Sequence, residues 1–175
     1  ASRLVERLAR RIVPRPAQDL VVAVAPHEDE VRMRTGGDQH DQREAGVHRR
    51  ALAVDPDSAA AHSNLGNVLG VQGKTAEAIT CYRRALETEP NDTEVLSNLG
   101  GALSAAGEAA EAVMHLSRAH EIAPGEPVIL FNLGNAYKEN GSLGEAAGCY
   151  ERALAIDPSN PEFLCNLGSA LLADG

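Results

Sequence analysis

The residues Gly-Lys-Thr at 73–75 are the first candidate for chemistry, because a phosphate-binding loop ends in these residue types. Such a loop also needs a glycine five positions before Gly73, and Val68 stands there. A buried strand should precede the loop, so that backbone N–H groups and a helix N-terminus surround the phosphates. Residues 59–70 instead space their apolar side chains as a helix does. We therefore predict no nucleotide site.

The stretches that contain histidine and carboxylates also lack the spacing of a reactive centre. His115 and His120 are five residues apart, about 140° around a helix, so they do not share a ligand face. The sequence HEDE at 27–30 lacks the second histidine of a zinc-binding helix, and DQHD at 38–41 is expected to be a solvated loop. We predict no active site, no metal site and no cofactor, and hence no enzyme within this chain.

Charge is distributed unevenly over the 175 residues. Residues 1–50 carry 10 Lys and Arg against 8 Asp and Glu, a net of +2, whereas residues 51–175 carry 6 against 17, a net of −11. An acidic surface argues against a nucleic-acid partner, because binding to phosphates is driven by Lys and Arg. No run of 18 apolar residues exists, so we predict no membrane span.

The cysteines lack the CxxC spacing of redox and metal sites, so we expect free thiols in a reducing compartment, the cytoplasm. They are Cys81, Cys149 and Cys165. The chain begins with Ala and ends inside a patterned segment, so we also expect a fragment of a longer protein.

An internal repeat organises residues 59–175. The tripeptide Asn-Leu-Gly recurs every 34 residues, at Asn64, Asn98, Asn132 and Asn166. The sequences VQGKTAEA, AAGEAAEA and ENGSLGEA recur in the same register and share only a glycine and the pair Glu-Ala. The Gly-Lys-Thr triplet is therefore interpreted as a turn between two helices, and its lysine is incidental.

Small residues recur where two helices of a unit must pack closely. With Ala59, Thr93, Pro127 and Pro161 as first positions, position 8 is always glycine and positions 20 and 27 are alanine, while a larger residue occupies position 24. A glycine inside a helix costs about 1 kcal/mol relative to alanine, so its recurrence requires a packing reason. Glycine at position 15 permits a chain reversal, and proline at position 32 cannot continue a helix.

These motifs resemble the tetratricopeptide repeat family, whose pattern is W-x2-L-G-x2-Y, then A-x3-F, then P, over 34 residues. The matching segments read HSNLGNVL and LFNLGNAY, then AITCY and AAGCY. His62 and Leu96 stand where the family has Trp. The resemblance implies an all-α right-handed superhelix, or α-α solenoid. It covers three repeats and the first helix of a fourth: 59–92, 93–126, 127–160 and 161–175.

Upstream of Ala59 the pattern weakens. Residues 43–58 are interpreted as the second helix of a degenerate repeat, whose first helix would fall at about 26–35. Residues 1–13 could form a basic amphipathic helix, while the rest of segment 1–42 is left without an assignment.

The resemblance also implies that the first helices line a concave groove. Position 6 is asparagine in all four units, and carboxamides offer both donors and an acceptor to the peptide groups of an extended chain. We expect these side chains to be exposed and to bind a polypeptide. The candidate groove residues are Ser63, Asn64, Asn67, Ser97, Asn98, Phe131, Asn132, Asn135, Lys138 and Asn166.

Two functions remain open at this stage. The first is a non-catalytic adaptor or scaffold that binds a protein or peptide segment in the groove. The alternative is a substrate-recruiting arm, since the repeats resemble those of the O-linked N-acetylglucosamine transferases, whose catalytic domain would lie outside this chain. A third mode known in the family, a clamp for a carboxylate terminus, requires Lys and Arg where Ser63, Val128 and Asn132 stand.

Overall fold

The computed structural model describes residues 28–174. The chain divides into two compact units, 1–35 and 36–175. Of the first unit only the beginning of helix α2 (Glu28–Val54) is described, so the basic helix predicted at 1–13 lies outside the described residues. The second unit contains the remainder of α2 and all the repeats.

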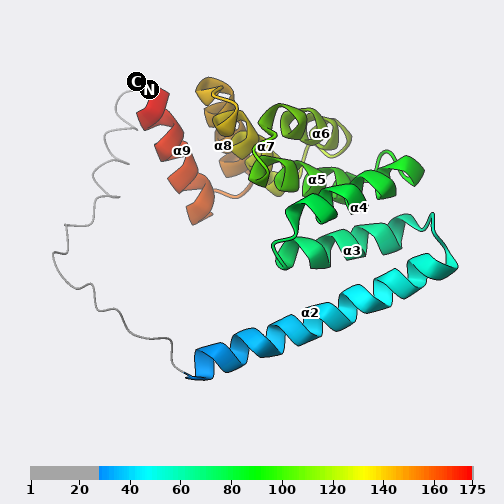
Figure 1. Cartoon of the computed structure of the whole chain (residues 1–175). Coiled ribbons are helices and arrows are strands. Elements are labelled where there is room, and N and C mark those ends of the chain that lie inside the picture. Colours follow the sequence, from blue (N-terminus) through cyan, green and yellow to red (C-terminus); the bar gives the residue numbers. More distant parts are fainter. Residues whose placement is uncertain (1–27, 175) are drawn as a thin grey trace. The chain divides into compact units, whose positions relative to one another are not determined.

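The described residues are all-α, as predicted from the sequence, and helices follow one another in chain order (Figure 1). Helices at the start of each 34-residue unit begin at the four residues that the repeat numbering places first. The helices after α2 are α3 (Ala59–Val71), α4 (Thr75–Thr88), α5 (Thr93–Ala105), α6 (Ala109–Ile122), α7 (Pro127–Glu139), α8 (Leu143–Ile156) and α9 (Pro161–Asp174). No helix in the described part of the chain is long and apolar enough to cross a bilayer.

The turns within each unit depend on glycine. Gly73, Gly107 and Gly141 have φ values of 72°, 82° and 84°, in the left-handed region that side chains with a Cβ disfavour. The N–H of Lys74 donates to the Leu69 carbonyl at 2.9 Å, which closes the last turn of α3. Gly73 and Lys74 thus lie in the turn between α3 and α4, and Thr75 begins α4, as the repeat register predicts.

Polar side chains begin three of the first helices. Asp92 Oδ1 accepts hydrogen bonds from the backbone N–H groups of Glu94 and Val95 at 3.0 and 3.1 Å. Ser58 and Asn160 cap α3 and α9 in the same way. These bonds satisfy N–H groups that have no partner in the first turn of a helix, so these three helices start at a defined residue, whereas α7 begins with Pro127 and has no side-chain cap.

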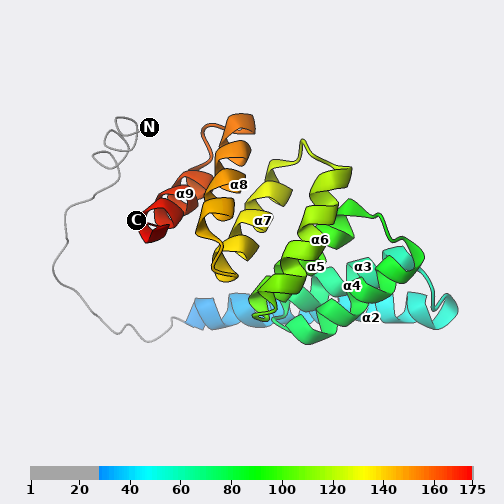
Figure 2. The ribbon, with the colours of Figure 1, turned by 90° about the horizontal axis from the view of Figure 1, so that it is seen from above.

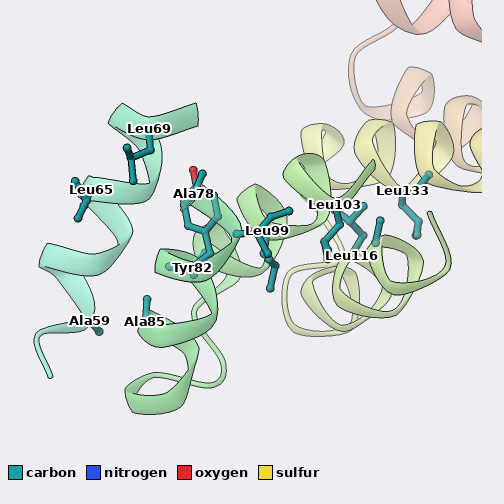
Figure 3. Close-up of a cluster of buried hydrophobic side chains, with 14 of the residues drawn as sticks. Ala59, Leu65, Leu69, Ala78, Tyr82, Ala85, Leu99, Leu103, Leu116 and Leu133 are labelled. Atoms are coloured by element: carbon teal, nitrogen blue, oxygen red, sulfur yellow. The ribbon is translucent and has the colours of Figure 1, made fainter. Parts of the chain in front are cut away.

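The position-8 glycines are explained by what faces them. A Cβ added to Gly66 would lie 2.6 Å from Cε1 of Tyr82, and one added to Gly134 would lie 2.6 Å from Cε1 of Tyr150. A Cβ added to Gly100 would overlap the side chain of Leu116 in the same way. Tyr82 belongs to a buried cluster that extends from Ala45 on α2 to Cys149 on α8, part of which Figure 3 shows. Glycine therefore gives up helix propensity to let the two helices of a unit approach.

The first helices form one layer of the second unit. The backbones of α3 and α5, of α5 and α7, and of α7 and α9 approach one another. Each of these helices also packs against the second helices, α4, α6 or α8, that adjoin it in the chain (Figure 2). Between residues 75 and 156, the second helices α4, α6 and α8 make no comparable approach to one another. Residues at the same repeat position on α3, α5, α7 and α9 are therefore brought into register along one surface.

Two expectations upstream of the repeats are wrong. Helix α2 is continuous from Glu28 to Val54, so residues 28–35 do not form a separate first helix and residues 38–41 do not form a loop; residues 26 and 27 of the predicted helix lie outside the described residues. Gly36 and Gly37 suggest a break, yet each glycine costs only about 1 kcal/mol within a helix. The flanking Glu, Arg, Met and Gln residues favour helix strongly enough to continue through them.

Candidate functional site

The ten candidate groove residues all lie on the first helices α3, α5, α7 and α9. Asn64 is exposed, but Asn98, Asn132 and Asn166 are half-buried. The expectation that position-6 asparagines are freely exposed is therefore wrong for three of the four. The reason is that consecutive first helices lie side by side, so a side chain on one helix reaches residues of the preceding helix.

Asn98 joins a hydrogen-bonded network that spans three helices. Its Nδ2 donates to Oδ1 of Asn67 at 3.0 Å, and the hydroxyl of Tyr82 donates to the same oxygen at 2.9 Å. Asn67 Oδ1 thus accepts two bonds, one from the next repeat and one from its own second helix. The network fixes the orientation of the Asn98 carboxamide.

The next unit replaces this network with a simpler bond. Gly101 stands where Asn67 stands one repeat earlier, and Leu116 replaces the tyrosine. Asn132 Nδ2 then donates to Ser97 Oγ at 3.2 Å. Ser97 is only 8% exposed, so it supports Asn132 rather than offering a free groove hydroxyl.

The third unit restores the tyrosine-asparagine pair. The hydroxyl of Tyr150 donates to Asn135 Oδ1 at 2.7 Å. Lys138 Nζ donates to Asn166 Oδ1 at 3.3 Å, so the one cation among the candidates is held by the next repeat. Two predicted groove residues, Asn135 and Lys138, therefore have partners inside the fold.

Phe131 and Ser63 complete the predicted set. The ring centroid of Phe131 lies 6.0 Å from that of Tyr150 and 5.0 Å from that of Phe163, and Phe131 is half-buried. It therefore contributes to packing between repeats as well as to the surface. Ser63 is half-buried on α3.

Tyrosine has a role in this site that the motifs did not predict. Position 9 is asparagine where position 24 is tyrosine, and glycine where position 24 is leucine. This pairing was visible in the sequence, and it marks a hydrogen bond between the two helices of a unit. Burial raises the pKa of Tyr82 and of Tyr150 to about 12, so both hydroxyls are protonated donors at neutral pH.

Two of the position-6 carboxamides, those of Asn98 and Asn132, keep an acceptor for an external group. Oδ1 of Asn98 and Oδ1 of Asn132 accept no hydrogen bond from any residue that the structure describes. Each of the two carboxamides donates an N–H to a side chain of the preceding repeat, and this hydrogen bond fixes the position of the carboxamide oxygen. An oriented oxygen on successive helices can accept hydrogen bonds from N–H groups without large loss of side-chain entropy.

Within the described residues, no group of three or more His, Cys, Asp and Glu side chains has the arrangement of a metal site. Burial raises the pKa of the Cys149 thiol and also that of the Cys81 thiol. His115 Nε2 lies 3.5 Å from Glu111 Oε1 on its own helix.

Comparison with protein families agrees with this architecture. A model described as a tetratricopeptide repeat matches residues 57–124, and one described as a TPR repeat matches residues 134–175, together more than half of the chain. The chain belongs to the tetratricopeptide repeat family. The comparison with curated proteins gave no match.

Solved structures give the same fold. The structure titled "Crystal structure of MamA" has a TM-score of 0.74 and 22% identity, over 87% of each chain. A MamA RS-1 double mutant has a TM-score of 0.74 and 17% identity, over 83% of this chain and 82% of that one. The first TPR of Spaghetti (RPAP3), bound to the HSP90 peptide SRMEEVD, has a TM-score of 0.64 and 27% identity, over 68% of this chain and 94% of its own.

Proposed function

We propose that the chain is a protein-interaction module that binds an extended polypeptide segment along the surface of α3, α5, α7 and α9. The module acts as a non-catalytic adaptor. The observation that carries this proposal is the pair of oriented carboxamides, Asn98 and Asn132, each with an unused Oδ1 and each at the same repeat position. Backbone N–H groups of an extended segment are the natural donors to such a row of acceptors.

The side chains around these carboxamides favour recognition of a peptide backbone. Val71 and Val128 are exposed on the first helices, and Lys138 already donates to Asn166. This surface therefore provides apolar area and amide groups. It also carries the exposed carboxylates of Glu94, Glu139 and Glu162, which form no ion pair among the described residues. Hydrogen bonds to the main chain would be available to many sequences, and these carboxylates would disfavour a strongly acidic segment.

The RPAP3 repeat bound to an HSP90 peptide supports a peptide ligand for this fold. Its ligand ends in Glu-Glu-Val-Asp, whereas the present chain has Ser63, Val128 and Asn132 where a clamp for a carboxylate terminus requires cations. We therefore propose an internal, extended segment as the ligand. The family models describe repeats alone, so the recruiting-arm alternative has no support from them and we retain the adaptor.

The test uses peptides selected from a random 12-residue display library on the wild-type protein, with affinity measured by fluorescence anisotropy. The double variant Asn98→Ala/Asn132→Ala should weaken binding about 5- to 150-fold, because two hydrogen bonds contribute about 0.5–1.5 kcal/mol each. N-methylation of alternate peptide bonds should weaken binding by a similar factor. Unchanged affinity in the double variant would contradict the proposal.

Asn140→Ala is the matched control, because Asn140 is exposed at the C-terminal end of α7 and lies outside the position-6 row. It should bind the selected peptides as the wild type does. Circular dichroism of each variant separates loss of binding from loss of fold.

A further inference from the structure

Successive second helices are joined by an ion pair that recurs with the repeat. Arg49 of α2 lies 3.8 Å from Glu77 of α4, and Arg83 of α4 lies 2.8 Å from Glu111 of α6. These arginines are one repeat apart, at position 25, and these glutamates are one repeat apart, at position 19. The hydrogen bond from Arg83 lowers the pKa of Glu111, as expected for a carboxylate that accepts a hydrogen bond from a guanidinium.

The third junction lacks its arginine. Ser117 stands at position 25, one repeat after Arg83, while Glu145 still stands at position 19. Glu145 makes no ion pair or hydrogen bond within the described residues and is exposed. Glu145 therefore lacks the guanidinium that lies beside the equivalent glutamate at each of the two preceding junctions.

A pocket opens at this junction. Its volume is about 360 Å³, and α6, α7 and α8 all contribute to its wall. Ser117 and Glu145 both line it, together with Leu133, Tyr137 and Gly148. A Cβ on Gly148 would meet no atom within 4 Å, whereas the equivalent positions of the earlier repeats carry the larger Thr80 and Met114. The missing arginine and the missing side chain at Gly148 thus coincide with an open space.

The charges in the pocket favour a cation. Glu121 lines it in addition to Glu145 and also forms no ion pair among the described residues. The guanidinium of Arg152, another lining residue, donates to Nε2 of His120 at 2.6 Å. Burial and the neighbouring Arg152 lower the pKa of His120, so this imidazole is neutral at pH 7. Two carboxylates and one guanidinium leave the lining with a net negative charge.

We propose that this pocket binds an arginine side chain of a partner protein, whose guanidinium pairs with Glu145 in place of the absent position-25 arginine. A planar guanidinium can also stack on the ring of Tyr137, and the aliphatic stem of the side chain can lie against Leu133. None of the position-6 asparagines lines the pocket, so the site is separate from the one proposed on the first helices.

The test is a titration of the ¹⁵N-labelled protein with N-acetyl-arginine amide, followed through the backbone amide of Gly148. We expect a saturable shift. N-acetyl-citrulline amide, which has the same shape and no charge, should give no saturable shift, and N-acetyl-lysine amide should bind at least fivefold more weakly. An equal response to the citrulline or the lysine probe would overturn the proposal.

Two substitutions test the position of the ligand. Ser117→Arg should restore the internal ion pair, occupy the pocket and abolish the shift at Gly148, whereas Thr80→Arg, an arginine at an exposed position outside the pocket, should bind the arginine probe as the wild type does. Glu145→Gln should weaken binding at least fivefold. Retained affinity in both Ser117→Arg and Glu145→Gln would show that the guanidinium does not enter this pocket.

Discussion

At the scale of single residues, the oxygen of Asn67 connects stability with the proposed binding surface. It accepts one hydrogen bond from the buried Tyr82 and another from Asn98 of the next repeat. Asn67 was expected to contact a ligand. In the structure it instead orients Asn98, the side chain that we propose contacts the ligand. Loss of this oxygen would leave a tyrosine hydroxyl without a partner in a mostly apolar environment, which is costly.

Removal of the Tyr82 hydroxyl should reduce stability without a change of fold. We expect Tyr82→Phe to lower the free energy of unfolding by about 0.5–1.5 kcal/mol, measured by urea denaturation. Tyr137→Phe is the control, because Tyr137 is half-buried and its hydroxyl has no hydrogen bond among the described residues, and its effect should stay within about 0.5 kcal/mol. Equal effects of the two substitutions would show that the Tyr82–Asn67 bond contributes nothing.

Stability should also depend on the ionisation of the two buried tyrosines. Burial raises the pKa of each from 10.0 to about 12, so the unfolded state loses these protons at a lower pH than the folded state. Their contribution to stability is therefore complete below pH 10 and is lost as the pH rises toward 12. Absorbance titration of Tyr137→Phe, which retains only Tyr82 and Tyr150 of the chain's 3 tyrosines, should give a midpoint near 12. A midpoint near 10 would contradict the burial of both hydroxyls.

The position-6 row illustrates how far residue-level prediction extends. The recurrence of Asn98 and Asn132 at one position was readable from spacing, because the 34-residue period is regular. The hydrogen bonds that they donate to Asn67 and Ser97 could not be read from the spacing. These partners lie on the preceding first helix, and the contact between the two side chains depends on how the repeats stack. Whether the row binds a peptide stays a prediction.

At the scale of helices, two adjacent glycines have different roles, and the repeat register separates them. Gly100 and Gly101 are neighbours inside α5, yet only Gly100 faces Leu116 across the unit. The recurrence of glycine at position 8, and not at position 9, was the signal for close packing. Gly36 and Gly37 gave no such periodic signal, and there helix α2 continues where a break was expected.

Substitution of these two adjacent glycines should have opposite effects. Gly100→Ala should destabilise the protein by about 1–3 kcal/mol, because the new Cβ overlaps Leu116. Gly101→Ala should stabilise it by about 0.5–1 kcal/mol, because its Cβ meets no atom within 4 Å and alanine favours the helix. Urea denaturation of both variants gives the two signs. A stabilising Gly100→Ala would contradict the packing reason for glycine at position 8.

At the scale of the repeat array, the fold was largely predictable because each level of the sequence agrees with the next. Periodic Leu65 and Leu99 define a buried face, the turn glycine reverses the chain, and proline ends the second helix before the next unit starts. The junctions between units were less predictable. The pocket beside Ser117 coincides with two departures from the pattern, Ser117 at position 25 and Gly148 at position 22. The first is recognisable only once the Arg83–Glu111 ion pair shows what position 25 does.

The central claim is that the surface of the first helices binds an extended polypeptide through the position-6 carboxamides. The measurement that tests it most directly is an NMR titration of a library-selected peptide into the wild-type protein, followed through the side-chain amide groups of asparagine. We predict that the side-chain signals of Asn98 and Asn132 shift and saturate together, while those of Asn91 and Asn140 do not move. Saturable shifts confined to α4, α6 and α8, with Asn98 and Asn132 unchanged, would contradict the account.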